Sequence, residues 1–178
     1  TNIRNQADMG GCGGINTGLG FAGWGAGGRT KSPPPDYLWL IDDDAEVAPD
    51  ALMHLTRTMA SSPDVGLVGT RTVNIVDRQT TIETTIYYNS WTGAMQDDCP
   101  PENPKRAAFE KWIPKVGSTR GLDKDGKPIQ YSGQMDVDVV SACSMLARWG
   151  AVTGTADPNR PAVGFWDWRY FIYCDDAD

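Results

Sequence analysis

The chain has 178 residues, of which 40% are hydrophobic, and this is enough for one folded domain with a buried core over residues 1–178. Its formal net charge of -7 argues against a nucleic-acid partner, because such proteins neutralise phosphates with Lys and Arg. No stretch approaches the roughly 18 apolar residues of a membrane span, so membrane association is expected only through regions outside this segment. The four cysteines form no CxxC pair, and we expect reduced thiols in a cytoplasmic setting.

The first part of the chain is dominated by glycine, in the run MGGCGGINTGLGFAGWGAGG. Such a run is too glycine-rich for an ordinary helix, so we expect a glycine loop followed at most by a short helix over residues 16–24. The prolines of KSPPPD then force extended geometry. The apolar run Tyr37–Ile41 is typical of a strand buried on both faces, and it ends directly in the carboxylates of Asp42, Asp43 and Asp44.

A helix is predicted over residues 49–60. Pro49 suits the first helical turn and Asp50 complements the helix dipole. The apolar residues of the segment recur at the spacing of one helix face: Leu52, Leu55 and Met59. A turn then leads to a short strand at residues 65–68. Strand, helix and strand in this order predict a parallel α/β unit with a right-handed crossover.

The second half of the chain is less regular. Residues 80–88 alternate in a way that predicts a half-exposed strand, with Ile82, Thr84, Ile86 and Tyr88 on one face. Residues 89–133 are polar and are expected to form a long excursion from the sheet. Apolar residues return at 137–146, which predicts a central strand. The end of the chain, from residue 163, is aromatic-rich and closes on carboxylates.

The carboxylates of Asp42, Asp43 and Asp44 follow the first predicted strand at the end where ligands usually bind. Ligands of parallel α/β sheets gather outside the carboxyl ends of the strands. Asp42 and Asp44 would project alike if the strand continued, while Asp43 would point away. Oxygen ligands in this arrangement suit Mg²⁺ or Mn²⁺ together with substrate phosphates. The other interpretation is a solvated acidic loop that caps the following helix, but three clustered charges against a buried strand would repel one another without a cation.

The glycine run also contains a match to GxGxxG, from Gly18 to Gly23, with Asp42 roughly where a ribose-binding acid would lie in a dinucleotide fold. That fingerprint requires a strand immediately before it. The preceding residues, ADMGGCGGINT, do not have the pattern of a strand. A nucleotide-binding oxidoreductase therefore stays open only as an alternative.

The motifs carry a resemblance when they are taken together. Their order is GGCGGINTGL, DYLWLIDDDAEVAPDAL, VGLVGTRTVN, VDVVSACSMLAR and WRYFIYCDDAD. This set resembles family 2 glycosyltransferases of the GT-A fold, in particular bacterial galactofuranosyl and rhamnosyl transferases, over nearly the whole chain except 89–133. The resemblance implies a mixed, mainly parallel sheet flanked by helices, and a role in cell-wall or polysaccharide biosynthesis.

The same resemblance implies site residues. Asp42 and Asp44 would hold Mn²⁺ or Mg²⁺ and the diphosphate of a UDP- or dTDP-sugar, with Asp43 close by. Asp176 would be the catalytic base, with Asp175 as the alternative. The glycine segment would lie beside the donor through Gly13, Gly14 and Asn16.

Two acidic clusters suit an inverting glycosyltransferase. One carboxylate takes the proton from the acceptor hydroxyl while a cation offsets the charge that gathers on the departing diphosphate. Helix capping is the other interpretation of the carboxylates at residues 175–178. The acceptor would be a saccharide or a lipid-linked sugar, and Trp166 and Trp168 could stack on it.

The resemblance is incomplete in two places. The N-terminal strands that hold the nucleotide base in family members are missing, and so is a histidine that some members carry after the late acidic pair. We therefore expect a segment of a longer polypeptide that binds donor poorly or does not turn over alone. A non-catalytic carbohydrate-binding module, supported by the tryptophans, is the remaining alternative.

Overall fold

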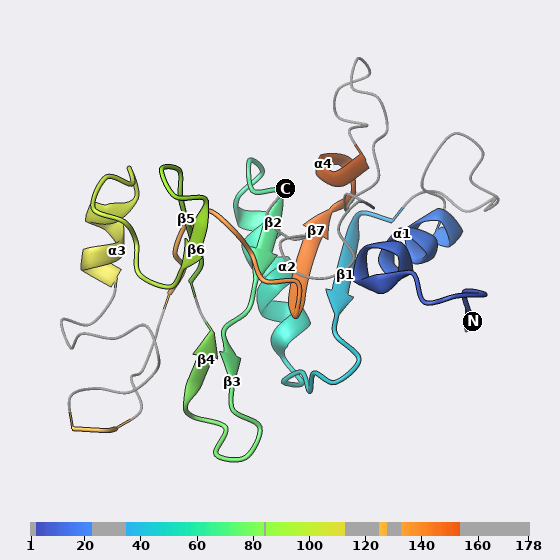
Figure 1. Ribbon diagram of the computed structural model, residues 1–178, viewed down its shortest axis with the longest axis horizontal. Coiled ribbons are helices and arrows are strands. Elements are labelled where there is room, and N and C mark those ends of the chain that lie inside the picture. The colour runs from blue at the N-terminus through green and yellow to red at the C-terminus, as the bar shows by residue number, and fades with distance from the viewer. Residues whose placement is uncertain (1–2, 23–34, 84, 113–124, 128–132, 154–178) are drawn as a thin grey trace. The chain divides into compact units, whose positions relative to one another are not determined.

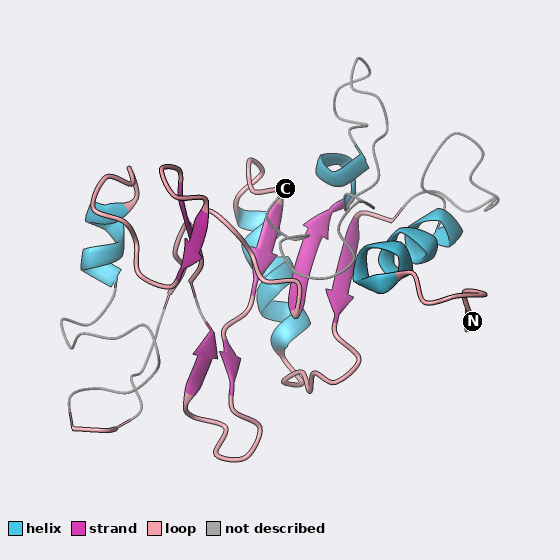
Figure 2. Cartoon of the chain, viewed as in Figure 1, coloured by secondary structure: helices cyan, strands magenta, loops and turns pink. Residues whose placement is uncertain are grey.

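The computed structural model describes residues 3–22, 35–83, 85–112, 125–127 and 133–153, and the structural statements below concern these residues. Helices and strands are mixed, which confirms an α/β chain at this coarse level (Figures 1 and 2). The elements in chain order are α1 (Gly10–Ala22), β1 (Tyr37–Ile41), α2 (Ala51–Ser61), β2 (Leu67–Gly69), β3 (Thr72–Val73), β4 (Thr81–Glu83), β5 (Tyr87–Asn89), β6 (Ala94–Gln96), α3 (Arg106–Trp112), β7 (Ser144–Arg148) and α4 (Trp149–Thr153).

The chain divides into two compact units. The first comprises Thr1–Leu40, Thr56–Val68 and Leu146–Asp178, and the second comprises Ile41–Leu55 and Gly69–Met145. None of the helices in the described ranges is long and apolar enough to cross a membrane.

The glycine-rich segment forms the helix α1, so the expectation of a glycine loop here was wrong. Gly10 begins the helix with a positive φ of 66°, and its N–H donates to Asp8 Oδ1 at 2.9 Å. Glycine is the residue for which this backbone conformation carries no steric cost. Cys12 and Leu19 are buried and give the helix an inward face. This burial offsets the low helix propensity of a segment with so many glycines.

A three-stranded sheet has the order β1-β7-β2 (Figure 1). Trp149 N donates to Asp36 O at 3.0 Å just before β1, and Asp42 N donates to Cys143 O at 3.1 Å just after it. The residues of β7 thus meet β1 in descending order, so the two strands are antiparallel. The predicted central strand at 137–146 is central, as expected, but it begins later, at Ser144.

β2 lies on the other side of β7. Arg148 N donates to Gly66 O at 2.8 Å, and a Cβ on Gly69 would lie 3.9 Å from Ser144 O. This pairing is antiparallel as well, so β1 and β2 run in the same direction with β7 between them. Gly69 is needed here, because its Cβ would lie only 2.6 Å from Val140 Cγ1. The predicted strand, helix and strand are all present, but the described part of the chain contains no parallel pair of neighbouring strands.

The predicted strand Tyr37–Ile41 has the predicted bounds but not the predicted burial. Tyr37 to Leu40 are half-buried, and Ile41 is 40% exposed. The helix predicted at 49–60 is α2, which begins two residues later. Leu55 and Met59 are buried as expected, whereas Leu52 is exposed.

Arg148 joins the C-terminal end of α2 to the sheet. Its Nη2 donates to Met59 O at 2.8 Å, and its Nε donates to Val65 O at 3.2 Å. The guanidinium lies 5.7 Å from the centroid of the Tyr37 ring. A cationic donor on the last helical carbonyls is favourable because those groups lack partners within the helix. This one side chain therefore contacts α2, the segment before β2, and β1.

Residues 80–88 form two short strands rather than one. β4 pairs with β3 and β5 pairs with β6, in both cases antiparallel. The alternation is present, and the buried face is the one opposite Ile82 and Tyr88. Ile82 and Tyr88 are exposed, whereas Thr81, Thr85 and Tyr87 are buried. The Thr85 hydroxyl donates to Asp97 O at 2.9 Å, and this bond makes burial of the polar residue favourable.

The segment predicted as a long polar excursion contains regular structure, β6 and α3, over a small core of its own. Tyr87, Cys99 and Phe109 form this core, with Met135 and Val137 packed against it. The rings of Tyr87 and Phe109 meet edge to face, with centroids 5.4 Å apart and an interplanar angle of 84°. Such aromatic pairs contribute about 0.5–1.5 kcal/mol beyond their buried area.

Asp138 accepts three hydrogen bonds beside this core. Its Oδ2 accepts from Asn103 Nδ2 at 2.6 Å and from Tyr88 N at 3.1 Å, and its Oδ1 accepts from Lys105 Nζ. Burial alone would raise the pKa of this carboxyl group. The bonds from Lys105, Tyr88 and Asn103 outweigh burial and hold the pKa below its usual value. The side chain of Asp138 is 18% exposed, but the residue as a whole is exposed, so water partly screens these bonds.

The stabilisation from Asp138 is expected to disappear in acid. Because its folded-state pKa is lowered, the full contribution is present above the ordinary aspartate pKa of about 3.9 and is lost as the pH falls toward the folded value. Asp138→Asn should lower the free energy of unfolding by about 1–3 kcal/mol at neutral pH, and by progressively less below about pH 4. Urea denaturation of both proteins across this range measures the difference. A difference that stays constant down to about pH 3 would contradict the assignment.

Candidate functional site

Asp42, Asp43 and Asp44 lie in a tight turn at the end of β1. The strand ends at Ile41, and Ala45 N donates to Asp42 O at 3.2 Å, which closes the turn. The extended geometry that underlay the predicted projection of Asp42 and Asp44 is therefore absent. All three aspartates are exposed. The bond from Asp42 N to Cys143 O fixes the start of the turn against the residue that precedes β7.

Two of these carboxylates act on the same group, the Cys143 thiol. Burial raises the pKa of this thiol, the negative charge of Asp42 raises it further, and a hydrogen bond with Thr72 lowers it. Glu83 and Asp44 also raise this pKa. A charge has such an effect only when it lies nearby. The turn and the β3–β4 pair, in which Thr72 is the cross-strand partner of Glu83, thus converge at Cys143.

An exposed ion pair ties the loop after the turn to the β3–β4 hairpin. Arg78 Nη2 lies 2.9 Å from Glu46 Oε1 and 3.2 Å from Oε2. Arg78 has a positive φ of 55°, and its N–H donates to Asn74 O at 2.7 Å. Asp77 orders the same hairpin, because its carboxylate accepts from the N–H groups of Gln79 and Thr80, both at 2.9 Å. The loop after the acidic turn is therefore linked to the β3–β4 hairpin through Glu46 and Arg78.

A divalent metal can be held in two ways, by protein side chains alone or by a few side chains together with the substrate phosphates and water. Within the described ranges, no group of three or more His, Cys, Asp and Glu side chains could hold a metal ion. Mg²⁺ is commonly held by one or two carboxylates, with substrate phosphates and waters completing its shell. Asp42 and Asp44 are two exposed carboxylates in one turn, which is the number of protein ligands that such a shared site needs. They do not fit a metal cage made of protein groups alone.

The three residues assigned to the donor in the glycine segment all lie in α1. Gly14 is exposed and Gly13 is half-buried, as is Asn16. A Cβ on Gly13 would lie 2.4 Å from Met9 Cβ, whereas a Cβ on Gly14 would meet nothing within 4 Å. Thr17 donates its hydroxyl to Gly13 O at 2.7 Å.

Residues 18–22 of the GxGxxG match also lie in this helix, and Gly23 lies outside the described residues. Gly18 and Gly20 are helical, and the described residues before α1, 3–9, form no strand. A dinucleotide fingerprint places its glycines in the turn between a strand and a helix. The local structure therefore lacks the context that the oxidoreductase alternative requires.

The remaining predicted site residues lie outside the described part of the chain. They are the proposed base Asp176, its alternative Asp175, and the acceptor tryptophans Trp166 and Trp168. Their roles stay predictions.

Three residues near the acidic turn had no functional assignment from the sequence: Thr72, Glu83 and Cys143. A weak signal existed for Cys143, because it lies in the segment VDVVSACSMLAR that carries part of the resemblance. Glu83 and Thr72 had none, since their place beside Asp42 depends on strand pairing between distant segments.

Comparisons with protein-family models, with curated proteins and with solved structures gave no match for this chain.

Proposed function

We propose that the chain is the core of a metal-dependent inverting glycosyltransferase. The observation that carries the proposal is the tight turn directly after β1, which Asp42 and Asp44 both occupy and which the bond from Asp42 N to Cys143 O fixes. Two exposed carboxylates in one turn can share a divalent cation with a diphosphate. The ordered motifs of the sequence support the same assignment, as does the place of the acidic turn at the end of a strand. The finer GT-A arrangement, with a mainly parallel sheet, is part of this proposal.

The proposed mechanism gives each acidic cluster one task. Asp42 and Asp44 bind the donor through a cation and fix the direction of its diphosphate. A bound Mn²⁺ or Mg²⁺ would supply positive charge for the leaving group. Asp176 takes the proton from the acceptor hydroxyl, and Asp175 is the alternative base. The acceptor is a saccharide or a lipid-linked sugar, and a cytoplasmic location belongs to the same proposal.

Calorimetric titration with UDP- and dTDP-sugars tests this function. Weak binding of at least one of them is expected in the presence of Mn²⁺, because the strands that hold the nucleotide base are missing from the segment, and no binding is expected in the presence of a chelator. NAD(H) provides the comparison for the oxidoreductase class. Binding of NAD(H) without metal, combined with no response to either nucleotide-sugar, would overturn the proposal.

The glycine helix offers a separate test with a matched pair of variants. Gly14→Ala should stabilise the protein by about 0.5–1 kcal/mol, because the site is open and alanine is the better helix former. If the donor approaches the backbone here, the same change should weaken nucleotide-sugar binding. Gly13→Ala should destabilise the protein, because its Cβ would clash with Met9. Thermal denaturation and donor titration measure both effects, and unchanged binding by Gly14→Ala would remove this residue from the donor site.

Sugar binding without catalysis is the second candidate, and one observation favours it. Trp91, in the turn between β5 and β6, is 87% exposed, and the cross-strand pair Tyr88 and Met95 is exposed beside it. An exposed aromatic side chain can stack on the apolar face of a sugar ring. Saccharide binding that is lost in Trp91→Ala but survives Asp42→Asn with Asp44→Asn would favour this class.

A further inference from the structure

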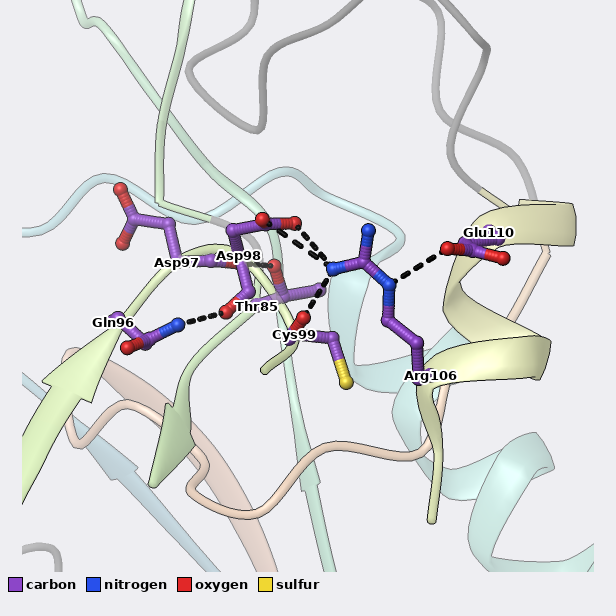
Figure 3. Close-up of polar contacts among 7 residues, drawn as sticks. All are labelled: Thr85, Gln96, Asp97, Asp98, Cys99, Arg106 and Glu110. Atoms are coloured by element: carbon purple, nitrogen blue, oxygen red, sulfur yellow. Dashed lines mark hydrogen bonds and ion pairs between the residues drawn. The ribbon is translucent and has the colours of Figure 1, made fainter. Parts of the chain in front are cut away.

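The segment from Asp97 to Trp112, called the strap below, is held in shape by one arginine. Arg106 Nε donates to Glu110 Oε1 at 2.8 Å, its Nη1 lies 3.4 Å from both carboxylate oxygens of Asp98, and Nη1 also donates to Cys99 O (Figure 3). All of these partners belong to the strap itself. The guanidinium also lies 5.6 Å from the centroid of the Phe109 ring. Arg106 thus links the start of the strap to α3.

A separate set of contacts attaches the strap to the rest of its unit. Thr85 donates to Asp97 O at one end. Asp138 accepts from Asn103 and from Lys105 in the middle. Asp138 is itself fixed, because its N–H and that of Val139 both donate to Ile86 O at 3.2 Å. Gln96 Nε2 also donates to Asp98 O at 2.8 Å, beside the Thr85 bond. The bonds that shape the strap are therefore carried by Arg106. Those that attach it are carried by Thr85 and Gln96 at its start and by Asp138 in its middle.

Burial of Tyr87 under the strap carries a free-energy cost. The hydroxyl of Tyr87 is buried and has no hydrogen-bond partner among the residues that the structure describes. An unsatisfied buried polar group costs about 1–3 kcal/mol relative to the hydrated group. Cys99, carried by the strap, is fully buried against Tyr87 and Phe109. Opening of the strap would hydrate the Tyr87 hydroxyl and expose the Cys99 thiol at the same time.

We propose that residues 97–112 form a strap that opens as one unit, away from Tyr87 of β5, while the remainder of the protein stays folded. Asp138 is the latch, the residue whose hydrogen bonds hold the strap closed. The opening breaks the bonds that Asn103 and Lys105 donate to Asp138 and separates Phe109 from Tyr87. The internal bonds of Arg106 remain. Units of this kind open with a free energy below that of global unfolding.

Thiol labelling of Cys99 tests the strap. The reporter protein carries Cys12→Ser, Cys143→Ser and Cys174→Ser, so that Cys99 alone reacts. Its labelling rate is expected to depend only weakly on urea, because local opening exposes little surface. Asp138→Asn is expected to raise the rate about ten- to hundred-fold, since it weakens the charged hydrogen bonds of the latch. Glu46→Gln, which removes an exposed carboxylate outside the strap, serves as the matched control and should leave the rate unchanged.

Two further variants keep the test decisive if Asp138→Asn is poorly folded. Tyr87→Phe should slow the labelling of Cys99, because it removes the hydroxyl that gains hydration on opening. A second reporter that retains only Cys12, which is buried in α1, gives the rate at which the first unit opens. The strap is refuted if Cys99 reacts no faster than Cys12 and with the same urea dependence. It is also refuted if Tyr87→Phe leaves the Cys99 rate unchanged.

Discussion

Replacing both Asp42 and Asp44 by asparagine is expected to abolish the metal dependence of nucleotide-sugar binding. The two carboxylates provide the negative charge that holds the cation between the protein and the diphosphate. Removal of groups that merely support metal ligands costs about 10–100-fold in affinity, so loss of both carboxylates should cost about a hundred-fold or more. Titration with donor in Mn²⁺ and in chelator measures the effect.

A matched control lies on the same loop. Glu46 is exposed and paired with Arg78, so Glu46→Gln removes one negative charge without touching the proposed ligands. This variant should bind donor as the wild type does. If Glu46→Gln lowered binding as much as the double variant, general charge would explain the result and the assignment of Asp42 and Asp44 would fail.

In the full-length parent enzyme, Asp176→Asn is expected to leave donor binding nearly intact and to remove sugar transfer. Asparagine is close in size to aspartate but cannot accept the proton of the acceptor hydroxyl. General-base catalysis contributes about 10²–10⁴-fold, and a fall in kcat of this size is predicted, with little change in donor affinity. A preparation that transfers sugar is required, with transfer and donor binding measured on the same sample.

Asp175→Asn and Asp178→Asn distinguish the base from its neighbours. Neither should lower kcat as Asp176→Asn does. If Asp175→Asn alone abolishes transfer, the base is Asp175. Retained turnover in all three variants would remove the late acidic cluster from the chemistry.

The elements that the sequence predicted best are those specified locally. The run Tyr37–Ile41 is bounded by prolines and by charges, and its strand has the predicted bounds. α2 carries the helical spacing of Leu55 and Met59 and begins within two residues of the prediction. Burial of β1 was overestimated because an apolar run indicates a strand but does not reveal how much neighbouring structure covers it.

Elements that depend on distant contacts were predicted less well. The glycine segment is helical although its propensity is poor, and burial of Cys12 and Leu19 accompanies this. Tyr87 is buried in place of the apolar Ile82 because its ring packs on Phe109, more than twenty residues away. No periodicity within 80–88 contains that information, since a strand shows its alternation but not which face finds a partner.

The residues of the candidate site also differ in whether the sequence alone could identify them. Asp42 and Asp44 could be selected from the sequence because they follow an apolar run directly. Their neighbours Glu83 and Cys143 could not, because β3–β4 pairing and the bond from Asp42 N to Cys143 O bring them near. The latch residue Asp138 was likewise assigned only to a strand, and its partners lie more than thirty residues away.

Electron paramagnetic resonance of Mn²⁺ tests the central claim most directly, because it reports the cation itself. A nucleotide-sugar and Mn²⁺ are mixed with wild-type protein, with the Asp42→Asn, Asp44→Asn double variant, or with no protein. The nucleotide-sugar binds some Mn²⁺ by itself through its diphosphate, so the sample without protein gives the reference signal. The signal of free Mn²⁺ is expected to fall below this reference with the wild type and to stay at the reference with the double variant. An equal fall with the double variant, or no fall below the reference with the wild type, would contradict the assignment of Asp42 and Asp44.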